Sequence, residues 1–220
     1  MKKLGVIVPY RDREEHLKIF APYIKKFLRY KQIPNFLIIV EQVDDKSFNR
    51  AKLLNIGYEY AQDTCDYFVF HDIDLIPEKN TDYSWVDRPT HLSHYCSQFN
   101  YKLPYDRLFG GVSMFNKEDF IKVNGFSNTF WGWGAEDDEI RARCDREGLI
   151  VDRRPGRYTS LPHNKAKVTY EEVNRNGKEW RKVLNNRDNG EYKNNGINSL
   201  KYELIDIEKN EHYYLLKVKL

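Results

Sequence analysis

The sequence predicts an α/β protein with a mostly parallel sheet flanked by helices and a C-terminal antiparallel hairpin. Three apolar segments, at 4–9, 36–42 and 66–72, alternate with stretches whose apolar residues have helical spacing. Strands that are apolar on both faces and alternate with helices are typical of a buried parallel sheet. Residues 200–207 and 212–220 instead alternate apolar and polar side chains, which predicts the hairpin.

The first half of the chain contains two predicted helices. The first is expected within residues 12–30, where Leu17, Phe20 and Ile24 share one face. Ser47 can cap the second, whose apolar face extends to Ala61. Ligands of such sheets bind beyond the carboxyl ends of the strands, so we expect the site there.

After Pro77 the alternation stops, and residues 78–108 are expected to be mostly irregular. The elements predicted after that are a strand at 109–116, a short helix at 117–123, a helix at 136–147 and a strand at 157–161. Three acids open the 136–147 helix, where the positive end of the helix dipole favours them. Residues 164–196 are polar, which predicts a mobile loop and one short helix around Trp180.

Composition and motifs exclude several classes of protein. The 36 Lys+Arg nearly balance the 33 Asp+Glu, which argues against a dedicated nucleic-acid binder. Apolar runs are far shorter than the ~20 residues that span a bilayer. The motifs of phosphate-loop NTPases, dinucleotide enzymes and serine hydrolases are absent. Cys65, Cys96 and Cys144 lack metal or disulfide spacing, so we expect reduced thiols and a cytoplasmic location.

Asp72 and Asp74, in the sequence HDID, leave the third apolar strand at its carboxyl end. Burying two carboxylates is costly without a cation. Carboxylate oxygens suit Mg²⁺ or Mn²⁺ ions that carry nucleotide phosphates, and residues i and i+2 of a strand share a face. The alternative is a strand end capped by solvated acids, with His71 as a packing residue.

The segment WGWGAEDDE at 131–139 places two tryptophans between glycines and three acids after them. Tryptophan rings stack on sugars, and a neighbouring carboxylate can take a proton from a hydroxyl nucleophile. We therefore expect a sugar site with a general base. The alternative is a pair of core tryptophans before an acidic helix N-terminus.

Other candidate ligand contacts give weaker signals. Arg11, Arg13 and Arg50 lie near predicted strand ends, where arginines suit bidentate phosphate binding, although each alone could be an ordinary solvated residue. Gly111 begins a strand where the backbone can approach a ligand, and a bend explains it equally well. His163 follows a predicted strand and is either a metal ligand or a surface residue.

Together these segments resemble the β1,4-galactosyltransferases, metal-dependent inverting enzymes of the GT-A fold. The similar blocks follow the family order over nearly the whole chain: VIVPYRDREEHL, FNRAKLLNIGY, FHDIDLIP, LPYDRLFGGVSMFNKEDFIKVNGFSNTFWGWGAEDDEI and GINSLKYEL. The resemblance implies transfer of galactose or N-acetylgalactosamine from its UDP conjugate to a sugar hydroxyl, with Mn²⁺ or Mg²⁺ as cofactor. We expect one catalytic domain that comprises a nucleotide-binding half (1–77), a sugar and acceptor half (78–163), a lid and polar segment (164–196) and the hairpin (197–220).

The resemblance also implies roles for single residues. Asp137 matches the general base, which would deprotonate the acceptor hydroxyl for in-line attack on the anomeric carbon. Glu136 and Asp138 match acids that orient donor and acceptor, and Asp74 and His163 match metal ligands. The substrate contacts implied are Arg11, Arg13, Phe48, Arg50, Asp72, Tyr105, Leu108, Gly111, Trp133, Gly134 and Ala135.

Departures from the family pattern affect the metal, the donor and the acceptor. Ser160 and Lys165 stand where the family has a methionine or a second histidine, so we expect Ser160 or water to complete an oxygen-rich shell that accepts Mg²⁺ nearly as well as Mn²⁺. Leu108 replaces a tyrosine beside the donor sugar C2, which favours UDP-GalNAc, the alternative being a neutral change. Ala135 replaces a glycine that faces the acceptor, so the acceptor is not transferred from the family.

Further expectations concern location and alternative functions. The family's secretory anchor and stem are not recognisable, which fits a bacterial or viral cytoplasmic enzyme that builds a surface glycan, or a trimmed chain. The Lys-rich residues 164–193 hint at peripheral membrane contact and a lipid-linked acceptor, and residues 164–180 are expected to close over bound donor. A metal-dependent sugar-nucleotide hydrolase or phosphodiesterase and a non-catalytic glycan-binding module stay open as other functions.

Overall fold

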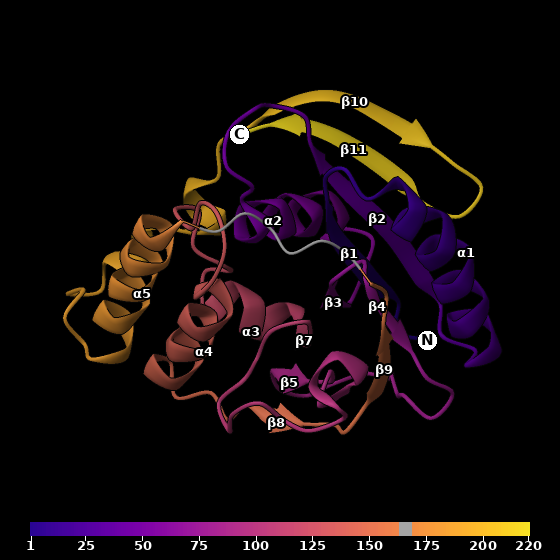
Figure 1. Ribbon diagram of the computed structural model, residues 1–220, viewed down its shortest axis with the longest axis horizontal. Helices are drawn as coiled ribbons and strands as arrows, with labels where there is room; N and C mark the ends of the chain where they lie inside the picture. Colours follow the sequence, from indigo (N-terminus) through magenta and orange to yellow (C-terminus); the bar gives the residue numbers. More distant parts are fainter. Residues whose placement is uncertain (163–168) are drawn as a thin grey trace.

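The computed structural model describes residues 1–162 and 169–220, which fold around an eight-stranded sheet (Figure 1). Its strand order is β10-β11-β2-β1-β3-β7-β5-β8. The strands are β1 (Leu4–Tyr10), β2 (Asn35–Gln42), β3 (Tyr67–His71), β5 (Thr90–His91), β7 (Val112–Asn116), β8 (Asp152–Arg153), β10 (Glu203–Lys209) and β11 (Tyr214–Lys219). The predicted α/β class is confirmed, and the sheet is mixed, because β7 runs antiparallel to both β3 and β5.

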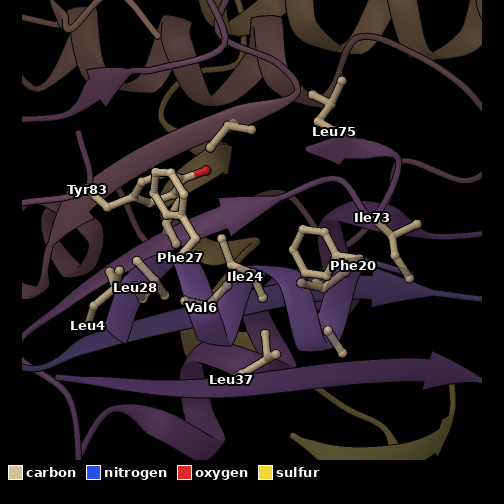
Figure 2. Packing of buried hydrophobic residues seen from close by; sticks show 14 of the residues in the cluster. Leu4, Val6, Phe20, Ile24, Phe27, Leu28, Leu37, Ile73, Leu75 and Tyr83 are labelled. Atoms are coloured by element: carbon tan, nitrogen blue, oxygen red, sulfur yellow. The ribbon is translucent and has the colours of Figure 1, made fainter. Parts of the chain in front are cut away.

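Helices cover both faces of the sheet because the central strands are apolar on both faces. In β1, Leu4, Val6 and Val8 pack with α1 (Glu14–Tyr30), and Ile7 packs on the opposite side with α2 (Arg50–Ala61). Figure 2 shows the α1 layer, where Phe20, Ile24 and Leu28 lie over the strands. The helices α3 (Lys117–Lys122) and α4 (Glu136–Arg146) also contribute to the α2 side, and α5 (Tyr170–Leu184) lies beside α4.

A second, three-stranded sheet begins shortly after β3, with strand β4. It pairs β9 (Arg157–Ser160) with β4 (Leu75–Pro77) on one side and with β6 (Tyr95–Cys96) on the other. This places the segment after HDID beside the segment that leads to residue 163. The carboxyl ends of β1, β2 and β3 open toward this junction, as the parallel arrangement requires.

Two predictions about helices need correction. The cap of α2 is Asn49, whose side chain accepts a hydrogen bond from Lys52 N, and not Ser47. Within 164–196, α5 is longer than the predicted short helix. It begins at a capping box in which Thr169 and Glu172 satisfy each other's backbone N–H groups. The polar composition hid this helix because only Asn176 and Val183 of α5 are buried.

The predicted C-terminal hairpin is confirmed, and it extends the main sheet. Strands β10 and β11 pair antiparallel, and β11 joins the edge of β2 in parallel. No helix in the described part of the chain is long and apolar enough to cross a bilayer. All three cysteines are buried and unpaired.

Candidate active site

Arg50, the first residue of α2, lies between two acids at the carboxyl edge of the sheet. Its Nε and Nη2 atoms both lie 2.7 Å from Asp72 Oδ1, and its Nη1 lies 3.5 Å from Glu136 Oε1. Asp72 directly follows β3, whereas Glu136 opens α4. The structure therefore joins the HDID and WGWGAEDDE segments, which are far apart in the sequence, through one guanidinium group.

The opposite charges of Arg50, Asp72 and Glu136 offset the effect of burial on each other's pKa. Burial raises the pKa of Asp72, and Arg50 opposes that shift. The same two causes act in the same order on the pKa of Glu136. Burial lowers the pKa of Arg50, but Asp72 and Glu136 more than reverse this, so its pKa is raised. Arg50 is thus the counter-ion of two carboxylates, and its contact with a diphosphate stays a prediction.

Asp137, the second residue of α4, has a carboxyl group with a strongly raised pKa. Burial, followed by the charges of Glu136 and Asp138, raises the pKa of Asp137 to about 7. Its Oδ1 accepts a hydrogen bond from Asp138 N at 3.0 Å. A general base works best when its pKa lies near the pH of the reaction. The raised pKa of Asp137 therefore suits the predicted role of general base.

A glycine pair borders this acid. A Cβ atom at Gly110 would overlap Asp137 Oδ2, so only a glycine leaves room for the carboxyl group. The predicted residue Gly111 has a different role: its φ is +77° and its carbonyl accepts from Asp72 N at 3.0 Å. Sequence reasoning missed Gly110, because the GG pair alone does not show which glycine touches the acid.

The two tryptophans of the WGWG segment have different environments. Trp133 is 62% exposed, as a sugar-stacking ring would be, whereas Trp131 is half-buried against the core beside α2. Gly132, Gly134 and Ala135 all have positive φ, which turns the chain sharply before α4. Ala135 adopts the left-handed conformation at φ +72° although glycine would be less strained there.

Helix α5 forms hydrogen bonds to the backbone of the segment that contains Trp131 and Trp133. Asn176 is buried, and its Nδ2 donates to Trp131 O at 3.2 Å and to Trp133 O at 3.3 Å. Glu172 also contacts the loop between β2 and α2, because its carboxylate accepts a hydrogen bond from Ser47 Oγ at 3.1 Å. Sequence reasoning missed Asn176, since an asparagine in a polar segment carries no signal of burial.

Tyr105 and Leu108 lie in a turn that reaches toward α4. Tyr105 Oη donates to Asp138 Oδ1 at 3.1 Å, and Leu108 N donates to Tyr105 O at 3.1 Å. Tyr105 is 44% exposed, and Leu108 is half-buried. The predicted acceptor tyrosine and the predicted donor-specificity residue therefore belong to one turn beside the acids.

Arg11 and Phe48 meet beyond the ends of β1 and β2. The Arg11 guanidinium lies over the Phe48 ring at 5.2 Å, and its Nη1 donates to Lys46 O at 2.7 Å. An aromatic ring beside an arginine is suited to a base and a phosphate. Arg13 stands at the N-cap position of α1, next to this pair in the chain.

Asp74 and Ser160 lie at adjacent ends of β4 and β9. Leu75 and Ser160 are register partners, and Leu161 N donates to Asp74 O at 2.7 Å. Ser160 Oγ is buried and has no hydrogen-bond partner among the described residues. A buried hydroxyl oxygen that needs a partner, close to a carboxylate segment, fits a hard cation.

The predicted third metal ligand, His163, lies outside the described residues. Within 1–162 and 169–220, no group of three or more His, Cys, Asp or Glu residues could hold a metal ion. His71 is a buried packing residue, as one of the two alternatives for the HDID segment predicted. Its ring nitrogens lie 2.7 Å from Tyr83 Oη and 2.8 Å from Asp72 O. Burial lowers the pKa of His71 to about 4.

Comparison with known proteins identifies the family of this chain. A family model described as the N-terminal region of glycosyl transferase group 7 matches residues 1–85, and one described as the N-terminal domain of galactosyltransferase matches residues 90–164. The catalytic domain of Drosophila β1,4-galactosyltransferase 7, solved with xylobiose, is 31% identical with a TM-score of 0.84. The match covers 100% of this chain and 94% of that one. The chain belongs to the β1,4-galactosyltransferase family.

Curated relatives within the β1,4-galactosyltransferase family are longer. β-1,4-Galactosyltransferase 4 of Mus musculus is 38% identical over 97% of this chain and 62% of its own length. β-1,4-Galactosyltransferase 1 of Homo sapiens is 35% identical over 98% of this chain and 54% of its own length. The chain thus spans a little over half the length of these animal relatives.

Proposed function

We propose that this chain is an inverting glycosyltransferase that moves galactose or N-acetylgalactosamine from a UDP-sugar to a sugar hydroxyl in β1,4 linkage. The environment of Asp137 carries the proposal: its carboxyl group lies between two other acids and against Gly110, with its pKa raised to about 7. An inverting transfer needs a base that can deprotonate the acceptor at neutral pH. A glycan-binding module does not need one.

The side chains around Asp137 can bind the sugars and orient the acceptor hydroxyl. Exposed Trp133 offers a ring face to the sugars, and Asp138, held by Tyr105, can orient the acceptor hydroxyl. Asp137 takes the hydroxyl proton while the oxygen bonds to the anomeric carbon and the bond from that carbon to UDP breaks. The Arg50 ion pairs keep Asp72 and Glu136 in fixed positions on the donor side.

The proposed cofactor is Mn²⁺ or Mg²⁺, held by Asp74, Ser160 and the predicted ligand His163. When bound, the cation neutralises charge on the diphosphate leaving group. A mutant of the Drosophila enzyme, 30% identical to this chain, was solved with manganese, UDP-Gal and xylobiose, which supports the proposal. An oxygen-rich shell with Ser160 should accept Mg²⁺ nearly as well as Mn²⁺. A metal titration of the transfer rate tests this, and a strict Mn²⁺ requirement would contradict it.

The proposed donor preference for UDP-GalNAc rests on Leu108. This side chain is half-buried in the turn that carries Tyr105, and it lacks a hydroxyl that could contact or obstruct the sugar C2 substituent. Leu108→Tyr should shift the ratio of kcat/KM values toward UDP-Gal. An unchanged ratio would refute the assignment of Leu108 as the donor-specificity residue.

The first experiment measures UDP release from UDP-Gal and UDP-GalNAc, with Mn²⁺, over a panel of β-glycoside acceptors. Release that an acceptor stimulates supports the transferase, and the faster donor identifies the preference. Release that no acceptor in the panel changes would favour the sugar-nucleotide hydrolase. No turnover with either donor would favour a glycan-binding module.

Other features of the enzyme stay predictions from the sequence. These are the bacterial or viral origin, the cytoplasmic location, a lipid-linked acceptor with peripheral membrane contact, and closure of a lid over the donor. Part of that predicted lid, residues 164–168, lies outside the described residues.

A further inference from the structure

A buried polar cluster at the end of β5 contacts the backbone of Gly110, the glycine beside Asp137. His91 is fully buried and Ser93 is 3% exposed. The carbonyl oxygen of Gly110 accepts from His91 Nε2 at 3.0 Å, from Ser93 Oγ at 2.8 Å and from Val112 N at 3.0 Å. Three donors on one carbonyl fix the position of the glycine that borders the Asp137 carboxyl group.

The tautomer of His91 follows from its second partner. Arg153 Nη1 lies 2.7 Å from His91 Nδ1. A guanidinium group can only donate, so Nδ1 accepts and the ring proton sits on Nε2, directed at Gly110 O. Burial and then the charge of Arg153 lower the pKa of His91 to about 3, so the ring is neutral at ordinary pH.

Arg153 connects this cluster to the turn at residues 105–108. Its Nη2 donates to the carbonyl of Asp106, in the turn between Tyr105 and Leu108. His91 and Arg153 are register partners on β5 and β8, so the two side chains meet at a defined point of the sheet. One histidine–arginine pair therefore ties together the turn at 105–108 and the backbone at Gly110.

We propose that His91 is a positioning residue for glycosyl transfer. Through Gly110, and through Arg153 to the turn at 105–108, it sets where the base Asp137 stands relative to the bound sugars. This inference rests on the proposed transferase function. An apolar residue would fill a buried strand position without the cost of desolvating an imidazole and part of a guanidinium, so the polar pair needs a reason beyond packing.

The test compares His91→Leu with His91→Gln. Leucine removes the hydrogen bonds of His91 with Gly110 O, Ser93 Oγ and Arg153, whereas glutamine keeps one N–H donor and one carbonyl acceptor. A displacement of about 1 Å at a catalytic group can cost roughly 100-fold in rate. We therefore expect His91→Leu to lower kcat by roughly 10- to 100-fold with little change in the KM of the donor, and His91→Gln to recover most of the loss.

Thr90→Val is the matched control. Thr90 lies on the same strand with 3% exposure, and its Oγ1 bonds only locally, to Arg88 O at 2.8 Å. This variant should unfold at a slightly lower temperature and keep the wild-type kcat. If His91→Leu does not fold, the partly exposed Arg153→Met replaces it, and its kcat should fall about tenfold or more.

The outcomes separate this inference from the proposed function. Absence of acceptor-dependent turnover by the wild-type protein overturns the proposed function itself. Wild-type turnover together with an unchanged kcat in His91→Leu, or in Arg153→Met where that variant is used, overturns the positioning role. Recovery of thermal stability but not of kcat by His91→Gln also overturns it. In the wild-type protein, ¹⁵N NMR should show His91 Nδ1 unprotonated, and a protonated Nδ1 would refute the assigned hydrogen bonds without reference to activity.

Discussion

Replacing Asp137 with Asn should stabilise this protein at neutral pH and abolish the proposed glycosyl transfer. The folded protein raises the pKa of Asp137 from 3.8 to about 7. The folded state therefore binds this proton more tightly than the unfolded state, and stability falls as the pH rises between these values. A shift of about three pKa units, at about 1.36 kcal/mol each, sets an upper limit of about 4 kcal/mol. Asparagine carries no charge, and its Oδ1 can still accept from Asp138 N.

Urea and thermal unfolding of both proteins, without metal or UDP, measure this effect as a function of pH. The stability gain of Asp137→Asn should be near zero at about pH 4 and reach ~2–4 kcal/mol above pH 7, or roughly 5–15 °C for a chain of this size. Asp145→Asn is the matched control on the same helix. Asp145 pairs with Arg107 and Arg141 near the surface, so its loss should cost less than about 1 kcal/mol. A difference between wild type and Asp137→Asn that does not grow with pH would refute the reasoning.

Three further predictions concern the protonation of Asp137, the glycine beside it and a buried ion pair of α4. The kcat/KM of the proposed transfer should rise with pH around 7, because Asp137 as the proposed base must lose its proton, and a flat profile from about pH 5.5 to 8.5 would contradict this. Gly110→Ala should lower kcat by roughly 10- to 100-fold because the added Cβ displaces the Asp137 carboxyl group. Gly177→Ala on α5 is the control. Its kcat should equal that of the wild type, and its free energy of unfolding should rise by up to about 1 kcal/mol. Arg143 and Glu139 form a buried ion pair within α4, with 2.8 Å between Arg143 Nε and Glu139 Oε1. Arg143→Leu should lower the free energy of unfolding in urea by about 3–5 kcal/mol, because it leaves the buried carboxylate without its partner. A loss below about 1 kcal/mol would show that the pair is dispensable.

Periodicity was enough to predict the first three strands and the first two helices. Leu17, Phe20 and Ile24 recur at helical spacing and are all buried in α1. Strand direction was harder to predict, because an apolar run such as VSMFN in β7 has the same pattern whichever way it runs. The antiparallel β7 and the parallel insertion of β11 depend on tertiary contacts that no local pattern contains.

The positions of several site residues could also be predicted from the sequence, whereas their contacts could not. Acids and arginines beyond strand ends were predictable, because the ends of parallel strands share one edge of the sheet. The partners of these residues were not: Arg50 pairs with Glu136, 86 residues away, and the buried Asn176 holds the tryptophan segment. Such contacts depend on how α2, α4 and α5 pack, and no single sequence motif contains all of them.

The parallel pairing of β11 with β2 also affects how the chain can fold. Asp44, just after β2, accepts a hydrogen bond from Leu220 N across 176 residues of chain. On a ribosome, β2 has therefore been made long before its outer neighbour, and meanwhile its apolar edge is open to other chains. Contacts of such long sequence separation form slowly. Until the hairpin docks, the first half of this protein therefore presents an unpaired strand edge of the kind that favours association between chains.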